Sequence, residues 1–245
     1  MPSYPTFPNA PITEAILDIQ VSLPSTTNLS DLAAIHAPIQ ERFPRREEKI
    51  ESKLKVELPA LLSKSPTFAT SSIGYLFRSP TGGKVVQSRF NGFTFNKLKP
   101  YESWQAFKCE AQELWEMYRD IVRPTKIRRF SLRYINRIVI PFGVDTKEYF
   151  LTGPEISPEL PQIFRSFFLR VEIVNEEIPA LGMINQAAQP ADETGLPIIF
   201  DIDVVKTIEL SPNTKDLWYS FEKLRDFKND IFFKSLTEKT KEMFK

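Results

Sequence analysis

The first regular element of the chain is a stretch of alternating residues, EAILDIQVSL (residues 14–23). Its odd-numbered positions are apolar (Ala15, Leu17, Ile19, Val21 and Leu23), and most of its even-numbered positions are polar. Successive side chains of a strand point to opposite faces, so this pattern predicts a half-buried strand. The exposed face of that strand is expected to carry Glu14 and Asp18.

Further strands are predicted from the same alternation and from turn residues. Residues 73–79 and 84–98 flank a turn containing Gly82-Gly83 and read as a hairpin. Three later strands are predicted at residues 166–175, 178–188 and 196–210. The charged run at residues 45–57 has no clear period, and it is predicted to be a solvated connection.

Two long helices are predicted from a period near 3.6. Residues 101–122 place six apolar side chains on one stripe: Trp104, Phe107, Ala111, Leu114, Trp115 and Tyr118. A second helix is predicted from about Thr214, and a shorter one at residues 28–43, capped by Asn28 or Ser30.

Hairpin-joined strands with a few long helices predict an α+β fold, a largely antiparallel sheet with helices packed on one face. The pattern W-x-x-F occurs in both long helices, as Trp104/Phe107 and Trp218/Phe221. This pattern raises the alternative of two repeated strand-strand-helix halves. We expect a single compact unit over residues 1–245, with a possible subdivision into 1–145 and 146–245.

Charge and composition exclude several classes of protein. The chain has 32 basic and 31 acidic side chains, so its net charge of +1 gives no field that would attract nucleic acid. The N-terminal stretch has no basic region followed by an apolar run, and no apolar run reaches about 18 residues. We therefore expect a cytoplasmic protein with no membrane partner.

The sequence lacks the motifs of the common enzyme classes. Its eight glycines form neither a dinucleotide-binding nor a P-loop fingerprint. The single histidine, His36, has no nucleophile motif near it and is predicted to be structural or exposed. Cys109 has no second histidine to activate it and is predicted to pack in the core, so no cofactor is expected.

The strand RRFSLRYINRIVIP (residues 128–141) carries the most unusual pattern. Phe130, Leu132, Tyr134, Ile138 and Ile140 share one face, and Arg129, Arg133 and Arg137 share the other. Arginines four residues apart in a strand lie about 13–14 Å apart, which is too far for all three to hold one phosphate. By the same alternation, the exposed faces of the neighbouring strands bear Arg170, Glu172, Asp201 and Asp203.

This charged sheet face has three interpretations. The first is a solvated face with cross-strand ion pairs, and the second is an interface with a protein partner. The third is a site in which Asp201, Asp203 and Glu172 hold a divalent metal and the three arginines hold phosphate. The apolar C-terminal helix offers a further partner surface, because the adjacent Phe232 and Phe233 cannot share one face.

Three stretches resemble a sporadically distributed prokaryotic family of conserved proteins of unknown function. They are NAPITEAILDI, RFSLRYINRIVIP and FEKLRDFKNDIFFKSLTEKTKEMF, and the elements R-Y-x-N-R-I and F-x-S-L-T are the most specific. The resemblance spans residues 8–244. It implies an intracellular bacterial or archaeal protein, gives no catalytic residues to transfer, and favours a regulatory or partner-binding role.

The preferred prediction is a non-enzymatic protein that binds another protein, or a second copy of itself, through the charged sheet face and the C-terminal helix. The candidate residues are Glu14, Asp18, Arg129, Arg133, Arg137, Arg170, Glu172, Asp201 and Asp203. The alternative is a metal-dependent, phosphate-handling enzyme or phosphate binder that uses the same face.

Overall fold

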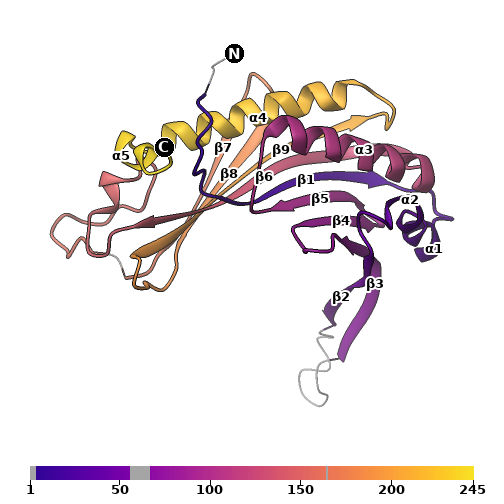
Figure 1. Cartoon of the computed structure of the whole chain (residues 1–245), viewed down its shortest axis with the longest axis horizontal. Coiled ribbons are helices and arrows are strands. Elements are labelled where there is room, and N and C mark those ends of the chain that lie inside the picture. The colour runs from indigo at the N-terminus through magenta and orange to yellow at the C-terminus, as the bar shows by residue number, and fades with distance from the viewer. Residues whose placement is uncertain (1–3, 56–66, 164) are drawn as a thin grey trace.

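Nine strands form a single antiparallel sheet in the computed structural model, which describes residues 4–55, 67–163 and 165–245 (Figure 1). The strand order is β2-β3-β4-β5-β1-β6-β9-β8-β7. The strands are β1 (Ile12–Ser22), β2 (Arg45–Lys55), β3 (Thr67–Arg78), β4 (Lys84–Arg89), β5 (Gly92–Leu98), β6 (Lys126–Ile140), β7 (Phe168–Asn175), β8 (Ala180–Ala188) and β9 (Leu196–Leu210). The predicted α+β class is confirmed.

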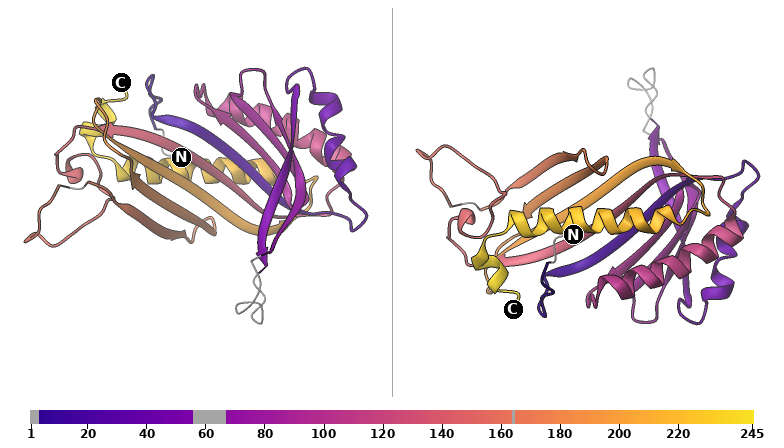
Figure 2. Two further views of the ribbon diagram at one scale, coloured as in Figure 1. Left: turned by 90° about the horizontal axis from the view of Figure 1, so that it is seen from below. Right: turned by 90° about the horizontal axis from the view of Figure 1, so that it is seen from above.

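Two long helices cover one face of this sheet, α3 (Trp104–Val122) and α4 (Asp216–Ser235) (Figures 1 and 2). The short helices α1 (Leu29–Ala33) and α2 (His36–Ile39) lie beside the end of α3, and α5 (Glu238–Glu242) follows α4. No helix of the described residues lies against the opposite face of the sheet, as the view from below shows (Figure 2).

The core lies between the sheet and the two long helices. Ala15, Leu17, Ile19 and Val21 of β1 are buried, as predicted, and so are Phe130, Leu132, Tyr134, Ile138 and Ile140 of β6. Aromatic rings join the layers, because Phe95 of β5 stacks on Phe107 of α3 with ring centres 5.3 Å apart. Phe130 of β6 meets Phe221 of α4 with ring centres 5.0 Å apart and the rings tilted by 55°. Burial of these large rings supplies the main stabilisation of the two-layer arrangement.

The order of strands repeats on the two sides of the β1–β6 pair. β1 is the first strand of its side and pairs with β5, after which α3 follows in the chain. β6 is the first strand of the other side and pairs with β9, after which α4 follows. On each side, therefore, the first strand pairs with the strand that precedes the helix: β1 with β5 before α3, and β6 with β9 before α4. Each of these two helices carries the W-x-x-F pattern.

The charged run at residues 45–57 was predicted to be a connection, and this is wrong for its described part. Residues 45–55 form β2, which pairs with β3 at the edge of the sheet; residues 56 and 57 lie outside the described residues. Edge strands tolerate charge on both faces, so they do not need an apolar alternation. Arg78 of β3 pairs with Glu47 of β2 at 3.1 Å, which is one such cross-strand contact.

Residues 84–98 were predicted as one strand, but they form two strands joined by a tight turn before Gly92. Gly92 has a φ of +149°, and a Cβ at this position would lie 2.1 Å from the carbonyl oxygen of Ile19. Only glycine fits where the turn approaches β1 so closely. The sequence Asn91-Gly92 was the local signal of this turn.

Two single-residue predictions have opposite outcomes. His36 is structural, because its ring stacks on Phe77 and its Nε2 lies 3.0 Å from the carbonyl oxygen of Phe43. Cys109 was predicted to pack in the core, but it is exposed on α3. It lies two residues after Phe107 and two before Ala111, both of which face the sheet, and this spacing turns it outward.

Candidate functional site

All nine residues predicted from the sequence to carry function lie on the sheet face that has no helix against it. Their strands run side by side in the order β1, β6, β9, β8 and β7 (Figure 1). The nine side chains occupy every second position of β1, β6, β7 and β9, and the positions between them face the helices, as the alternation predicted. We call this surface the open sheet face.

The three arginines of β6 contact three different carboxylates. Arg133 makes two hydrogen bonds to Asp201, of 2.8 and 2.7 Å, and this contact raises the pKa of the guanidinium. Arg129 lies 3.8 Å from Asp18, and Arg137 lies 3.2 Å from Asp192. Each arginine therefore has its own acidic partner, and the three do not converge on one anion-binding point.

The carboxylates proposed as metal ligands do not converge either. Asp201 already accepts hydrogen bonds from Arg133 and Asn185. Met183 of β8 lies opposite Asp203 on one side and opposite Glu172 on the other, so a full strand separates these two acids. The described residues contain no group of three or more His, Cys, Asp or Glu side chains that could hold a metal ion.

Some polar atoms of the open sheet face are buried without a hydrogen-bond partner. They are Arg89 Nε, Asn185 Oδ1 and Asp203 Oδ1. Burial raises the pKa of Asp203 to about 6, although the positive charges of Arg129 and Arg133 act in the opposite direction. Asp203 is thus a desolvated carboxyl group that titrates close to neutral pH.

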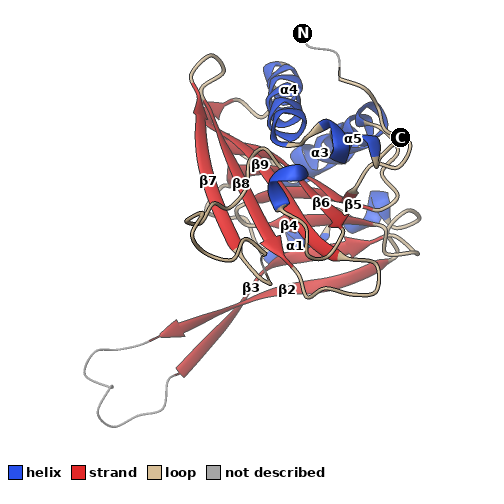
Figure 3. Ribbon diagram, turned by 90° about the vertical axis from the view of Figure 1, so that its left-hand side faces the viewer, coloured by secondary structure: helices blue, strands red, loops and turns tan. Residues whose placement is uncertain are grey.

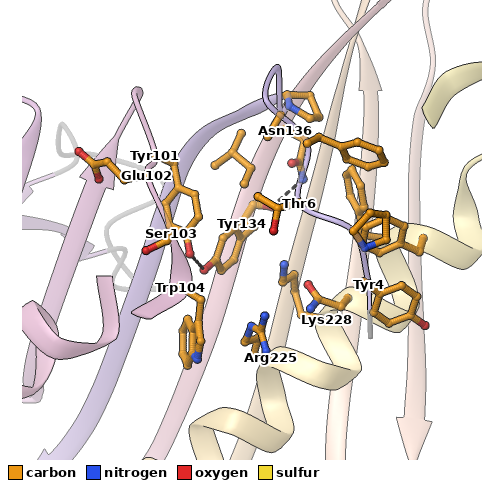
Figure 4. Close-up of a pocket in the computed structure, with 18 of the residues that line it drawn as sticks. Tyr4, Thr6, Tyr101, Glu102, Ser103, Trp104, Tyr134, Asn136, Arg225 and Lys228 are labelled. Atoms are coloured by element: carbon orange, nitrogen blue, oxygen red, sulfur yellow. Dashed lines mark hydrogen bonds between the residues drawn. The ribbon is translucent and has the colours of Figure 1, made fainter. Parts of the chain in front are cut away.

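A second site lies on the other side of the sheet and was not predicted from the sequence. It is a pocket of about 480 Å³ between the N-terminal segment, the start of α3, the strand β6 and the helix α4 (Figure 4). The lining includes seven aromatic residues, Tyr4, Phe7, Tyr101, Trp104, Tyr134, Phe232 and Phe233. Two basic side chains, Arg225 and Lys228, enter it from α4.

One wall of the pocket is the segment that precedes β1. Tyr4 stacks on Phe233 of α4 with ring centres 4.3 Å apart, and its hydroxyl donates a hydrogen bond to Asp230. The backbone N–H of Asn9 donates to the carbonyl oxygen of Phe244 at 3.0 Å. The segment is therefore fixed to the C-terminal part of the chain at two points along the pocket.

The floor of the pocket contains a pair of tyrosines. The hydroxyl groups of Tyr101 and Tyr134 lie 2.7 Å apart, and their rings meet edge to face at 5.4 Å. Burial raises the pKa of Tyr101 to about 12, and burial also raises the pKa of Tyr134. Both hydroxyls therefore stay protonated at neutral pH, and one of them has a proton to donate into the pocket.

Lys228 is the most unusual residue of the pocket. Only 9% of its surface is exposed, and its Nζ lies 4.0 Å from the centre of the Tyr134 ring. No hydrogen bond or ion pair joins this ammonium to another residue in the described part of the chain. Burial lowers the pKa of Lys228 to about 7, and the positive charge of Arg225 lowers it further.

Glu222, an acidic residue of the pocket lining, is already engaged in hydrogen bonds. Glu222 accepts hydrogen bonds from Trp104 Nε1 at 2.8 Å and from Lys108 at 2.5 Å, one on each carboxylate oxygen. The guanidinium of Arg225 lies 5.9 Å from the Trp104 ring, and its distance to Asp226 is 3.9 Å. Arg225 thus has Asp226 as an acidic partner, whereas Lys228 has no close negative partner in the described part of the chain.

The sequence did contain a signal for this pocket. Along α4 the buried positions follow the series Leu217, Phe221, Leu224, Lys228 and Ile231, which is a regular apolar stripe except for one lysine. A basic residue at a core position is rare unless it is paired, so its presence marks a candidate site. The prediction singled out Phe232 and Phe233 of this helix as a possible partner surface and overlooked Lys228.

Comparisons with known proteins identified no relative of this chain. No model of a protein family matches the chain, and no curated protein or solved structure matches it. The resemblance noted in the sequence stays a prediction. A membrane-crossing helix would need a longer apolar stretch than any helix in the described part of the chain offers.

Proposed function

We propose that the protein binds a small organic anion in the pocket beneath α4. The negative group of the ligand pairs with Lys228 and Arg225, and its apolar or aromatic body lies against the tyrosine and tryptophan rings. A pocket lined by aromatic side chains with a few convergent polar groups is the usual form of a small-molecule site.

The observation that carries this proposal is the uncompensated charge of Lys228. A buried ammonium without a carboxylate partner loses its hydration and gains little in return, so it destabilises the folded protein. The surrounding contacts, a tyrosine ring and a nearby arginine, do not remove this cost. An anion at this position supplies the missing partner, and it raises the pKa of Lys228 back toward its ordinary value.

The chemistry of the lining limits the ligand further. Arg225 offers a planar set of donors suited to a carboxylate or a phosphate, and the Tyr101–Tyr134 hydroxyl pair offers one more donor. The volume of about 480 Å³ fits a molecule with one or two rings. We therefore expect an aromatic carboxylate or a phosphate monoester rather than a long flexible chain.

The experiment is a titration by calorimetry with phenylpropionate and phenyl phosphate, each compared with its uncharged amide or alcohol. We expect one of the anions to bind and its uncharged counterpart to bind at least about tenfold more weakly, because burial strengthens the ion pair. Lys228→Met abolishes this preference. Lys234→Met is the matched control, since Lys234 is an exposed lysine of the same helix.

Equal binding of charged and uncharged probes by the wild-type protein would contradict the proposal. Equal affinities of the wild-type protein and Lys228→Met for an anion would also contradict it, because the anion would then lie elsewhere. Retained binding in Lys234→Met separates a local effect of Lys228 from a general loss of positive charge.

The predicted partner role of the open sheet face is the second candidate function. Its support is the set of buried, unpartnered atoms Arg89 Nε, Asn185 Oδ1 and Asp203 Oδ1, which a polar partner surface would satisfy. A protein captured by the wild-type chain is expected to be lost with Arg129→Glu. Binding of that protein should be retained with Arg128→Glu. This control replaces the same positive charge by a negative one at the neighbouring residue, whose side chain donates a hydrogen bond to Ser22.

A further inference from the structure

Strand β7 forms one margin of the sheet, and no strand among the described residues lies on its outer side (Figure 3). It pairs with β8 over eight consecutive residues without a register shift. It contains no proline, and Phe168 and Val174 are each 71% exposed. Natural edge strands are usually protected by bulges, prolines or a covering segment, so a regular, exposed edge of this kind is a template for another strand.

The hydrogen bonds of β8 determine which groups of β7 are free to pair outward. The N–H of Ala188 donates to the carbonyl oxygen of Phe167 at 3.1 Å, and these residues are in the register of the β7–β8 pair. In an antiparallel pair, hydrogen-bonded positions alternate along each strand. The odd-numbered residues of β7 therefore bond to β8, and the even-numbered residues direct their N–H and C=O groups outward.

The β8–β9 pair confirms this parity independently. The N–H of Gln189 donates to the carbonyl oxygen of Pro197 at 2.8 Å, so the odd-numbered residues of β8 bond to β9. The even-numbered residues of β8, which include Ala188, are then the ones that face β7. The outward groups of β7 consequently belong to Phe168, Arg170, Glu172 and Val174.

The same four residues form a sequence that is complementary to itself. Consider two copies of β7 that run antiparallel, with Val171 of one opposite Val171 of the other. Arg170 of each copy then lies opposite Glu172 of the other, and Phe168 lies opposite Val174. On the other face, Leu169 lies opposite Ile173. Opposite charges and apolar pairs at directly facing positions stabilise antiparallel strands.

Only this register combines correct hydrogen bonding with favourable side-chain pairs near the centre. If one copy is shifted by two residues, the outward N–H and C=O groups of the even-numbered residues still face each other. A shift in one direction places Arg170 opposite Arg170 of the second copy. In the other direction it places Glu172 opposite Glu172. Like charges at facing positions are destabilising, so the charge pattern selects a single alignment.

We propose that two copies of the chain pair along β7 in antiparallel orientation, with a two-fold axis through Val171. The two sheets join into one, and both helix layers lie on the same side of it. The Arg170–Glu172 contact of 2.7 Å within one chain is exchanged for two contacts between chains. This arrangement is an isologous interface, the commonest kind in homodimers, and it does not depend on the pocket.

The test is the molar mass of the purified protein in solution at increasing concentration. We expect the wild-type protein to form a dimer, and Arg170→Glu or Glu172→Arg to raise the dimer Kd by at least about tenfold, because each places like charges together twice. The double variant Arg170→Glu/Glu172→Arg restores opposite charges and should restore the dimer. Rescue of this kind distinguishes facing residues from a general effect of charge.

A second variant tests the backbone pairing. Glu172→Pro removes an N–H that is directed away from β8, so the single chain keeps its sheet but loses a hydrogen bond to the second copy. A wild-type protein that stays monomeric at about 100 μM would overturn the proposal. So would a dimer that persists unchanged in Glu172→Pro and in both single charge variants, since it would then use another surface.

Discussion

The ammonium nitrogen of Lys228 lies 4.0 Å above the ring of Tyr134, whose hydroxyl is bonded to that of Tyr101. The ring face stabilises the cation by about 1–2 kcal/mol in a desolvated site. That is less than the several kcal/mol that desolvation of an ammonium costs, so the contact does not compensate for burial. Lys228 therefore destabilises the free protein, as groups at binding sites commonly do.

This imbalance predicts that Lys228→Met increases the stability of the free protein. Methionine fills a similar volume without charge, and we expect the free energy of unfolding at pH 6 to rise by about 1–4 kcal/mol. Denaturation by urea measures the change. Lys234→Met should change stability by less than about 0.5 kcal/mol, since its pair with Asp230 is exposed. A destabilised Lys228→Met protein would show that the lysine has a structural partner.

The same residue predicts how stability depends on pH. The pKa of Lys228 is about 7 in the folded protein and about 10.4 in an unfolded chain. Between these values the unfolded state binds more protons, so this residue makes the folded state more stable as pH rises from 7 toward 10. The stability difference between Lys228→Met and wild type should accordingly shrink over this range, which urea denaturation at successive pH values measures.

Anion binding in the pocket should show the opposite trend. A bound anion pairs with the protonated form of Lys228, and the free protein loses this proton as pH rises through about 7. We expect the Kd of the anion to increase from pH 6 to pH 9, approaching tenfold per pH unit above the pKa. Calorimetry of wild type and Lys228→Met tests this, because the variant should bind weakly at every pH.

Asp203→Asn is predicted to stabilise the protein at neutral pH. The pKa of Asp203 is about 6 in the folded state and about 3.9 in an unfolded chain, so its carboxyl contributes stability below pH 4 that is lost as pH rises through 6. Asparagine resembles the protonated acid, and it should add about 1–3 kcal/mol at pH 7.5 and little at pH 4. Equal effects at the two pH values would contradict this explanation.

Gly92→Ala is expected to destabilise the sheet strongly. The added methyl group would lie 2.1 Å from the Ile19 carbonyl oxygen, in addition to the strain of a positive φ. We expect a loss above about 2 kcal/mol in the free energy of unfolding. Gly143→Ala is the control, because Gly143 also has a positive φ (+78°) but no atom within 4 Å of the added carbon. Its loss should be limited to about 1 kcal/mol.

Strand β6 illustrates what the sequence could and could not predict. The period of two assigned Phe130 to the core and Arg133 to the open sheet face, because each strand has one buried face. The same alternation turns Tyr134 toward α4, but whether a helix packs tightly there or leaves a pocket depends on distant segments. Tyr101 and Lys228 meet Tyr134 only through the tertiary fold.

Cross-strand ion pairs on the open sheet face were one interpretation of the sequence, but which residues pair could not be predicted for the same reason. The strand order places β9 beside β6, and only this neighbour relation brings Asp201 to Arg133 and leaves Asp203 without a hydrogen bond on Oδ1. Local patterns identify which residues share a face. They do not identify which strands are neighbours, because sheet order depends on contacts between residues far apart in the chain.

The binding of the N-terminal segment to the last helices also has a consequence for the synthesis of the protein. The pocket is bounded by residues 4–12 and by residues of α4, which are separated by more than 200 positions. A nascent chain that contains β1 to β5 still lacks β6 and α4. Residues 4–12 can therefore bind in their final position only once α4 has been synthesised. Ligand binding can therefore begin only after residues 216–235 have been synthesised and α4 has packed on β6, so the pocket is expected to form later than the β1–β5 part of the sheet.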